Sequence, residues 1–459
     1  MSDNFDTLNL IPELLSNLES LNFKKMTPIQ KESLPLVLAG KDVIARAKTG
    51  SGKTAAFALG VLNSLVVNES YPQCFILTPT RELADQVATE VRLLARALPN
   101  VKVVTICGGT AEFHQDKSLS HGAHIVVGTP GRILKLLKKK TLDPRNVKTF
   151  VLDEADRMLD MGFTNELKEI ERFIPKKRQS LLFSATFPYS IEDLSKNIQT
   201  DAVMVKVDTE IAKNIITETF YELDSHKDKN EALLAILGEL KPQRFIIFCK
   251  TKIITDSLVK FLDAEGVICA GIHGDIEQNE RLTTLAMFKN NSISGLIATD
   301  VAARGLDIKE LPAVFNYDLP IDSEDYVHRI GRTGRAGESG IAISLSVEKE
   351  AFKIEKLEEY LERKVKVEKF NFSKFTNSYD ILPPMDTMYI SGGKKEKLRP
   401  GDIVGALIHE AGLESDDIGD ITITNITSLV AIKKEKIKEA IEKLNAGKIK
   451  NKKFKVGLA

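Results

Sequence analysis

Residues 47–54 of this sequence combine glycine, lysine and hydroxyl side chains in an order suited to binding phosphate. They read Ala47, Lys48, Thr49, Gly50, Ser51, Gly52, Lys53 and Thr54, and they follow the strand-like run 42–45. Glycines let backbone amides curl around phosphate oxygens, and a following helix adds its positive end. The pattern predicts a nucleotide-binding loop, with Ala47 replacing the glycine of the generic motif. Lys53 would contact the β and γ phosphates, and Thr54 would bind Mg²⁺.

A second motif, Asp153-Glu154-Ala155-Asp156, directly follows the apolar run 149–152. Acidic residues at the carboxyl end of a buried strand are where an α/β nucleotide-binding fold places its magnesium ion and its attacking water. We predict that Asp153 completes the Mg²⁺ shell and that Glu154 orients or deprotonates the water that attacks ATP. A solvated turn is the alternative for the tetrapeptide alone. The preceding strand and the upstream loop favour the active-site interpretation.

A third motif could neutralise the charge that develops on the transferred phosphoryl group. Residues 328–335 place arginines at three-residue spacing among glycines, which allow a close approach. Arg332 and Arg335 are predicted to act as arginine fingers from a second lobe. A basic surface loop is the alternative for this segment alone, but a phosphate loop elsewhere in the chain favours the fingers.

Short apolar runs alternate with helix-length segments through most of the 459 residues. The clearest runs are 74–77, 125–127, 150–152, 181–183, 245–248, 295–298, 313–315 and 341–345. Runs this apolar predict parallel sheets that helices cover on both faces. We therefore expect two α/β lobes, at residues 1–207 and 208–370, that the polar stretch 208–214 connects.

The C-terminal part of the sequence predicts a separate, smaller domain. Residues 371–385 lack periodicity and contain Pro383-Pro384, which indicates a linker. Residues 386–459 show the order strand, helix, strand, strand, helix, strand, which predicts an α+β ferredoxin-like fold shared by RNA-recognition modules. A lysine run near the end is either a solvated tail or a phosphate-contacting edge. Its members include Lys448, Lys450, Lys452 and Lys453.

The composition bounds the partners and the compartment. The 64 basic and 64 acidic residues give a formal net charge of zero, so any nucleic-acid binding must depend on placed residues. No apolar run approaches the ~20 residues of a membrane span, and the N-terminus lacks a signal sequence. The four cysteines lack paired spacing, which favours buried thiols in a reducing compartment. We expect a cytoplasmic monomer without a membrane partner.

Together, these motifs resemble those of the DEAD-box RNA helicases over about residues 5–370. The resemblance implies two RecA-like lobes, an RNA-dependent ATPase activity and an RNA path across both lobes. Residues 27–30 are similar to the family's adenine-reading motif, so Gln30 would read the adenine edge, with Phe5 and Phe23 supporting it. Asn22 and Met26 stand where the family usually has glycine and proline. We expect this change to alter backbone stiffness rather than adenine recognition.

The resemblance also implies roles that the residues alone do not reveal. Ser184, Thr186, Asp156 and His328 would couple the ATP and RNA sites, and Gly305 and Asp307 would meet the nucleotide from the second lobe. The RNA path would consist of sugar–phosphate contacts, which carry no sequence information. Its predicted residues are Pro79, Thr80, Arg81, Gly108, Gly109, Thr129, Pro130, Gly131, Arg132, Thr251, Gln278, Arg281 and Thr299.

The C-terminal domain resembles the tail of the DbpA-type helicases, and the Ala47-Lys48-Thr49 start of the phosphate loop is also typical of them. This implies a bacterial helicase that unwinds short duplexes locally, with a tail that recognises a 23S ribosomal RNA hairpin in pre-50S particles. Residues 428–432 lack the aromatic side chains that normally stack on bases, so we expect phosphate contacts through lysines. A protein-docking tail, an ATP-gated RNA clamp, and a general cold-response or RNA-decay helicase stay open. A DNA helicase is disfavoured.

Overall fold

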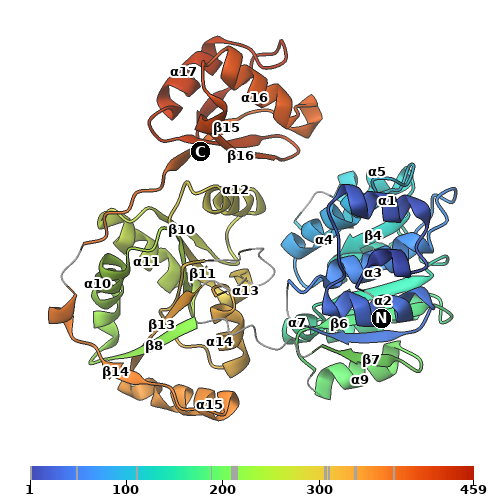
Figure 1. Ribbon diagram of the computed structural model, residues 1–459, viewed down its shortest axis with the longest axis horizontal. Helices are drawn as coiled ribbons and strands as arrows, with labels where there is room; N and C mark the ends of the chain where they lie inside the picture. The colour runs from blue at the N-terminus through green and yellow to red at the C-terminus, as the bar shows by residue number, and fades with distance from the viewer. Residues whose placement is uncertain are drawn as a thin grey trace. The chain divides into compact units, whose positions relative to one another are not determined.

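The structure, a computed structural model, describes residues 3–459 apart from 48–49, 110–111, 188, 208–215, 304–307, 309–310, 335–338 and 376–377. The chain divides into two compact units, Met1–Ile211 and Ala212–Ala459, drawn in blue to green and in green to red in Figure 1. We call the first unit the first lobe. The second unit contains the second lobe, up to Lys369, and a C-terminal domain that begins at Met385.

The first lobe is built on a seven-stranded sheet in which every paired strand is parallel. Its order is β3-β4-β2-β5-β6-β1-β7. The strands are β1 (Val43–Arg46), β2 (Cys74–Leu77), β3 (Val103–Ile106), β4 (Ile125–Gly128), β5 (Thr149–Asp153), β6 (Gln179–Ser184) and β7 (Val203–Lys206). The helices are α1 (Pro12–Ser20), α2 (Pro28–Leu38), α3 (Lys53–Asn63), α4 (Arg81–Leu94), α5 (Glu112–Ser120), α6 (Pro130–Lys138), α7 (Ala155–Asp160), α8 (Thr164–Phe173) and α9 (Tyr189–Ile198).

Alternate residues of these strands belong to two different cores. Val43 and Ala45 of β1 pack with residues of α1 to α4, whereas Ile44 between them packs with residues of α6 to α9. Because successive side chains of a strand point to opposite faces, helices cover the sheet on both sides. This explains why β2, β4 and β5 read as continuous apolar runs in the sequence.

The second lobe repeats this plan with a parallel sheet of order β10-β11-β9-β12-β13-β8-β14. The strands are β8 (Ile216–Leu223), β9 (Phe245–Cys249), β10 (Cys269–Ile272), β11 (Gly295–Thr299), β12 (Ala313–Asn316), β13 (Gly340–Val347) and β14 (Val367–Lys369). The helices are α10 (Lys229–Leu240), α11 (Lys252–Ala264), α12 (Gln278–Lys289), α13 (Asp300–Ala303), α14 (Ser323–Ile330) and α15 (Ala351–Leu361). Across all parts of the described chain, the short 3-10 turns are Phe5–Thr7, His226–Asp228, Glu348–Glu350, Phe372–Lys374, Lys394–Glu396 and Ser415–Asp417.

The C-terminal domain has an antiparallel four-stranded sheet and a core of its own. Its elements are β15 (Met385–Ile390), α16 (Pro400–His409), β16 (Ile418–Ile423), β17 (Ser428–Lys433), α17 (Ile437–Ala446) and β18 (Val456–Leu458). The strand order β16-β17-β15-β18 is that of a ferredoxin-like fold. The predicted fold class, two parallel-sheet lobes followed by a small α+β domain, is therefore confirmed.

The predicted linker between the second lobe and the C-terminal domain makes contacts of its own. Phe375 stacks on Phe370 with ring centroids 4.7 Å apart, and the Tyr379 hydroxyl donates to the Pro242 carbonyl at 3.0 Å. The Tyr379 bond and an edge-on contact of Phe375 with Tyr221 of β8, with centroids 6.0 Å apart, link the segment to the second lobe. The predicted connection between the lobes, residues 208–214, lies outside the described residues. In the part of the chain that the structure describes, no helix is both long and apolar enough to cross a membrane.

Candidate nucleotide and RNA sites

One edge of the first sheet carries both sets of predicted site residues. All its strands are parallel, so the loops after their carboxyl ends meet at the same edge, where α/β folds bind ligands. The phosphate loop, the acidic motif and residues 184–186 follow the neighbouring strands β1, β5 and β6. The predicted RNA-binding loops follow β3, β4 and β2. The strand order therefore separates a nucleotide half from an RNA half along one edge.

The phosphate loop has the backbone that its glycines predict. Gly50 and Gly52 have φ angles of 82° and 88°, in the left-handed region that suits glycine, and Gly52 caps the N-terminus of α3. Lys53, at the first position of α3, is buried, and its ammonium donates to the Ala47 carbonyl at 2.8 Å. The Ala47 amide in turn donates to the Ser184 carbonyl at 3.0 Å. The lysine thus bridges the loop that would hold the phosphates.

Asp153 ends β5 with a buried carboxylate that lacks full charge compensation. Burial raises the pKa of Asp153 to about 7, although the nearby Lys53 ammonium opposes the shift. A buried carboxylate of this kind fits a cation. Mg²⁺ is usually bound by one or two protein oxygens together with substrate phosphates, which the carboxylate of Asp153 and the hydroxyl of Thr54 suit.

Glu154 adopts the left-handed conformation, with φ 52°, between β5 and α7. Its Oε2 accepts a hydrogen bond from Arg157 Nη1 at 2.9 Å, and both side chains are buried. Sequence reasoning missed Arg157, because only its place one turn after Glu154 on a short helix hinted at the pair. The structure therefore gives the predicted water-orienting carboxylate a defined partner.

Asp156 connects the acidic motif to residues 184–186. Its Oδ2 accepts hydrogen bonds from the amides of Ala185 and Thr186, at 3.1 and 2.8 Å, and from the Thr186 hydroxyl at 2.9 Å. The Asp156 amide donates to Ser184 Oγ at 3.4 Å. Burial alone would raise the pKa of Asp156, but these hydrogen bonds outweigh it and lower that pKa. The structure brings these three predicted coupling residues together around one ionised carboxylate.

The predicted adenine-reading residues lie beside the phosphate loop. Gln30 Oε1 accepts from the Thr27 amide at 2.9 Å, and its Nε2 donates to the Gly52 carbonyl at 3.0 Å. The rings of Phe5 and Phe23 make an edge-on contact with centroids 6.4 Å apart. Gln30 is therefore positioned by its own helix cap and linked directly to the phosphate loop.

The two departures from the family pattern have local explanations. Asn22 has φ 61°, a left-handed conformation that asparagine tolerates better than other non-glycine residues. The Met26 amide donates to the Asp3 carbonyl at 2.7 Å, a bond that proline could not make. The chain thus uses Met26 to anchor its N-terminal segment beside α2.

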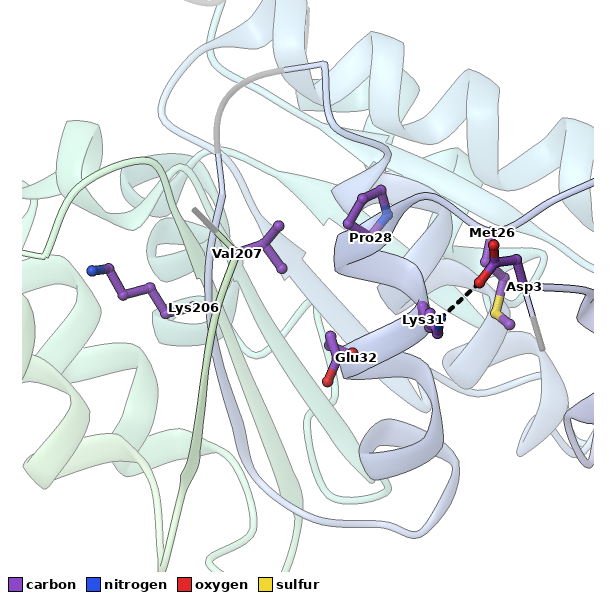
Figure 2. Close-up of a pocket in the computed structure, with 7 residues that line it drawn as sticks. All are labelled: Asp3, Met26, Pro28, Lys31, Glu32, Lys206 and Val207. Carbon is purple, nitrogen blue, oxygen red and sulfur yellow. Dashed lines mark ion pairs between the residues drawn. The ribbon is translucent and has the colours of Figure 1, made fainter. Parts of the chain in front are cut away.

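A pocket of 680 Å³ lies beside the start of α2 (Figure 2). Asp3 and Lys31 form an ion pair of 2.8 Å at its rim. Its lining consists of Asp3, Met26, Pro28, Lys31, Glu32, Lys206 and Val207. Gln30 and Phe23 do not line this pocket, so we do not assign it to adenine.

The RNA half of the first lobe is closely packed around its glycines. A Cβ atom on Gly109, which has φ 78°, would lie 1.9 Å from Arg81 Nη1, so the arginine crosses directly over the glycine backbone. Arg132 Nε donates to Gln115 Oε1 at 2.8 Å. Thr80 caps α4, the helix that follows β2. Pro79 and Gly108 lie in these same loops, and Thr129, Pro130 and Gly131 begin α6.

The second lobe places its predicted RNA residues after neighbouring strands in the same way. Thr251, after β9, caps α11 by accepting from the Ile254 amide at 3.3 Å. Thr299 ends β11, and Gln278 begins α12 after β10. Arg281 Nη2 donates to the Ala302 carbonyl at 2.7 Å, which joins α12 to α13.

The arginine-rich motif belongs to α14 and the turn after it. Arg332 is buried, and His328 Nε2 lies 4.0 Å from Glu324 Oε1. Sequence reasoning missed Arg329, which forms a two-pronged ion pair with Asp300 at 2.6 and 2.7 Å. Five predicted site residues lie outside the described residues, namely Lys48, Thr49, Gly305, Asp307 and Arg335.

Two basic loops of the C-terminal domain lie side by side. Lys450 Nζ donates to the Lys397 carbonyl and to Asp402 Oδ2, both at 3.0 Å. These hydrogen bonds link the loop around Lys397 to the loop around Lys450. Their exposed basic residues are Lys394, Lys395, Lys397, Arg399, Lys448, Lys450, Lys452, Lys453 and Lys455.

The face of the C-terminal sheet that lies opposite its helices is partly covered. Thr387 on β15 receives a hydrogen bond from Asn290 Nδ2 at 2.9 Å and donates to Ser292 Oγ at 2.8 Å. Leu429 and Ala431 of β17, which pair with Tyr389 and Thr387, are also buried. This is the face on which RNA-recognition modules stack bases.

Comparison with known proteins decides the family. A model of the DEAD/DEAH box helicase matches residues 27–194, and the helicase conserved C-terminal domain matches residues 228–337. The DbpA RNA binding domain matches residues 387–458. The ATP-dependent RNA helicase DbpA of Escherichia coli is 45% identical over 456 residues, covering 99% of each chain. The chain belongs to the DEAD-box ATP-dependent RNA helicases.

Within this helicase family the chain is of the DbpA type, since the RNA-binding domain and the full-length similarity agree. The DEAD-box helicase CshA of Bacillus cereus is 42% identical over 361 residues, or 79% of this chain and 69% of that protein. Yeast Dbp5 bound to RNA and ADP BeF3 superposes with a TM-score of 0.73 at 34% identity, covering 81% of this chain and 97% of that chain. Mss116p bound to single-stranded RNA and AMP-PNP gives a TM-score of 0.72 at 28% identity, covering 81% of this chain and 80% of that chain.

Proposed function

We propose that this DEAD-box helicase hydrolyses ATP in response to ribosomal RNA and locally unwinds short duplexes, targeted to 23S rRNA during large-subunit assembly. The targeting rests on one observation in the C-terminal domain. The hydrogen bond from Lys450 to the Lys397 carbonyl brings exposed lysines from two loops together at one basic edge. Such an edge suits phosphates and the shape of an RNA hairpin.

The partly covered sheet face supports an RNA site at this edge rather than on the sheet. Thr387, Leu429 and Ala431 are buried, so bases could not stack there without displacing Asn290 and Ser292. Residues 428–432 also contain no aromatic side chain that could stack on bases. Hairpin binding is accordingly expected to weaken steeply with salt.

In the first lobe we propose that Lys53 and the loop amides bind the ATP phosphates and that Gln30 reads adenine. Asp153 and Thr54 would hold a magnesium ion, which supplies positive charge to the phosphoryl oxygens when bound. Glu154 would orient the attacking water, and Arg332 and Arg335 would stabilise the charge that develops on the phosphoryl group. Asp156 would couple changes at the nucleotide to Thr186 through its hydrogen bonds with residues 185 and 186.

The decisive experiment compares ATPase rates stimulated by a 23S rRNA hairpin fragment and by homopolymer RNA. We expect strong preference for the hairpin in the unmodified chain, and loss of this preference when Lys448, Lys452 and Lys453 are changed to glutamine. The salt slope of hairpin binding should fall by about one for each phosphate contact removed. Glutamine at the exposed Lys436 and Lys438, outside the two basic loops, is the control for loss of positive charge elsewhere in the domain.

Equal stimulation by hairpin and homopolymer would refute the targeting while leaving the helicase assignment intact.

An ATP-gated RNA clamp is the second candidate, because a clamp would use the same sites. Strand separation and bound lifetime, measured on one short duplex, distinguish the two. A clamp holds the duplex for many turnovers without separating it.

A further inference from the structure

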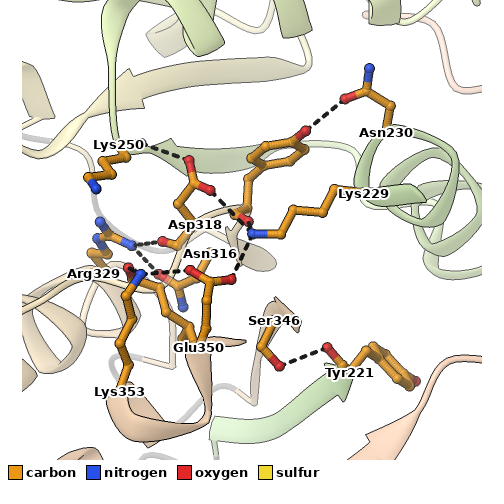
Figure 3. Close-up of polar contacts among 12 residues, drawn as sticks. Tyr221, Lys229, Asn230, Lys250, Asn316, Asp318, Arg329, Ser346, Glu350 and Lys353 are labelled. Atoms are coloured by element: carbon orange, nitrogen blue, oxygen red, sulfur yellow. Dashed lines mark hydrogen bonds and ion pairs between the residues drawn. The ribbon is translucent and has the colours of Figure 1, made fainter. Parts of the chain in front are cut away.

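Lys229 is the first residue of α10, and its side chain is only 1% exposed. Burial removes the hydration of an ammonium group, and the positive end of a helix repels it, so this position is doubly unfavourable for lysine. Its Nζ lies 3.2 Å from Asp318 Oδ1 and 3.2 Å from Glu350 Oε2, and donates to the Tyr317 carbonyl at 2.9 Å (Figure 3). Two carboxylates and a carbonyl therefore compensate the buried charge.

Asp318 connects this lysine to two segments that carry predicted site residues. Its Oδ2 accepts from the Lys250 amide at 3.0 Å, and Lys250 directly precedes Thr251. Its backbone carbonyl accepts from Arg329 Nη1 at 2.6 Å, and Arg329 lies three residues before Arg332. Asp318 thus contacts both the loop that carries Thr251, a predicted RNA-binding residue, and the helix that leads to Arg332, a predicted arginine finger.

Arg329 extends the connection to a third segment. Its Nε and Nη2 bind the two carboxylate oxygens of Asp300, which directly follows Thr299. Its Nη1 also donates to Asn316 Oδ1 at 3.0 Å (Figure 3). The ends of β9, β11 and β12 and the helix α14 therefore share one buried polar cluster.

We propose that Lys229 is a positioning residue that acts through Asp318 to hold the Thr251 loop and α14 in their working geometry. Neither Lys229 nor Asp318 was predicted from the sequence to belong to a site. A buried ion pair often contributes little net stability compared with apolar residues of similar size. We therefore infer that this pair serves to orient the residues around it. The inference rests on the proposed roles of Thr251 in RNA binding and of Arg332 in ATP hydrolysis.

The structure supplies a matched control. Glu350 contacts the same ammonium, but its other partner is Lys353 of α15, which leads to the Leu319 carbonyl rather than to Thr251 or Arg332. Removing the Glu350 charge perturbs the same buried lysine, yet leaves the contacts of Asp318 with Lys250 and Arg329 in place. A purely structural role for the cluster predicts the same consequences from either carboxylate.

The test is the RNA-stimulated ATPase of the full chain with three variants, Lys229→Met, Asp318→Asn and Glu350→Gln, together with their thermal midpoints. We expect all three to lower the midpoint. Asp318→Asn and Lys229→Met should raise the KM for RNA and lower kcat by about tenfold each, as loss of a hydrogen bond to a charged group implies. Glu350→Gln should keep both parameters within about twofold, since it spares the Asp318 contacts.

The outcomes separate the positioning role from the proposed function. If Asp318→Asn folds and matches Glu350→Gln in KM and kcat, the positioning role is overturned, and this holds even if Lys229→Met does not fold. If the unmodified chain shows no RNA-stimulated ATPase, the proposed function fails and takes the inference with it. A selective rise in KM with a fall in kcat, in Asp318→Asn but not in Glu350→Gln, supports the inference.

Discussion

Arg157 Nη1 lies 2.9 Å from Glu154 Oε2 within a buried ion pair at the first turn of α7. The two residues belong to one motif, and the arginine holds the carboxylate that we propose orients the attacking water. Because α7 begins directly after β5, the pair is fixed to the sheet edge that carries the phosphate loop. We therefore expect the geometry of Glu154 to depend on Arg157, which is not among the predicted phosphate contacts.

Replacement of Arg157 by methionine should leave Glu154 buried without its partner. Removing one member of a buried pair costs about 3–5 kcal/mol, so the first lobe should unfold at a lower denaturant concentration. We also expect a lower kcat with little change in ATP affinity, since Arg157 is not among the predicted phosphate contacts. Denaturant unfolding and steady-state kinetics check this. Unchanged kcat in a folded variant would show that the pair does not position Glu154.

The raised pKa of Asp153 makes the stability of the first lobe depend on pH. The carboxyl has a pKa of about 7 in the folded lobe and 3.8 as its ordinary value, so the folded state holds an extra proton between these pH values. Its contribution to stability is therefore greatest at low pH and is lost as pH rises through 7.

Because Mg²⁺ needs the ionised carboxylate, Mg²⁺–ATP binding should weaken below pH 7 and release protons. Titration of a fluorescent ATP analogue at pH 6 and pH 8 measures the effect. The Asp153→Asn variant should bind more weakly and lose most of this pH dependence. Equal affinities for the unmodified chain at both pH values would contradict the assignment of Asp153 as the Mg²⁺ ligand.

The bonds between Asp156 and Thr186 should matter for coupling more than for ATP binding. Thr186→Val removes the 2.9 Å hydroxyl bond to Asp156 Oδ2 but keeps the Thr186 amide bond of 2.8 Å. We expect ATP affinity to change by less than about threefold, because one neutral donor is lost outside the phosphate loop. Unwinding of a short duplex per ATP hydrolysed should fall much further. A proportional loss of both activities would argue against coupling.

The central strands were predictable and the edge strands were not. Residues 74–77, 125–127 and 150–152 are buried on both faces, so their sequences are continuously apolar. Strands β7 and β14 lie at sheet edges and contain exposed residues, and neither was predicted as a strand. Their places are set by neighbours far along the chain.

The candidate site residues were likewise predictable only where they lie close together in the sequence. The phosphate loop and the acidic motif are contiguous in sequence and were predicted, although the roles of their residues stay predictions. The Lys229–Asp318 contact joins residues 89 positions apart, and neither lies in a recognisable motif. The two basic loops of the C-terminal domain, bridged by Lys450 and Lys397 across 53 positions, likewise needed the fold to bring them together.

Asn22 stands where the family usually has glycine, and its backbone conformation predicts which substitutions it tolerates. Its φ of 61° is a left-handed conformation, which costs a β-branched residue roughly 1–2 kcal/mol and costs glycine nothing. Asn22→Gly should therefore be close to neutral, and Asn22→Val should lower the free energy of unfolding of the first lobe. Denaturant titrations of the two variants provide the measurement. Equal destabilisation by both would rule out backbone strain as the explanation.

We propose that ATP and RNA each favour binding of the other and that Glu154 promotes hydrolysis of the bound ATP. The Glu154→Gln variant isolates the binding steps, and Glu13→Gln on the exposed side of α1 is the control for loss of an acidic charge. The most direct measurement is the Kd of this variant for single-stranded RNA with and without ATP. We predict much tighter RNA binding with ATP, an equal gain in ATP affinity with RNA, and negligible turnover. Normal turnover would contradict the role of Glu154, and an RNA affinity that ATP does not change would contradict the cooperativity.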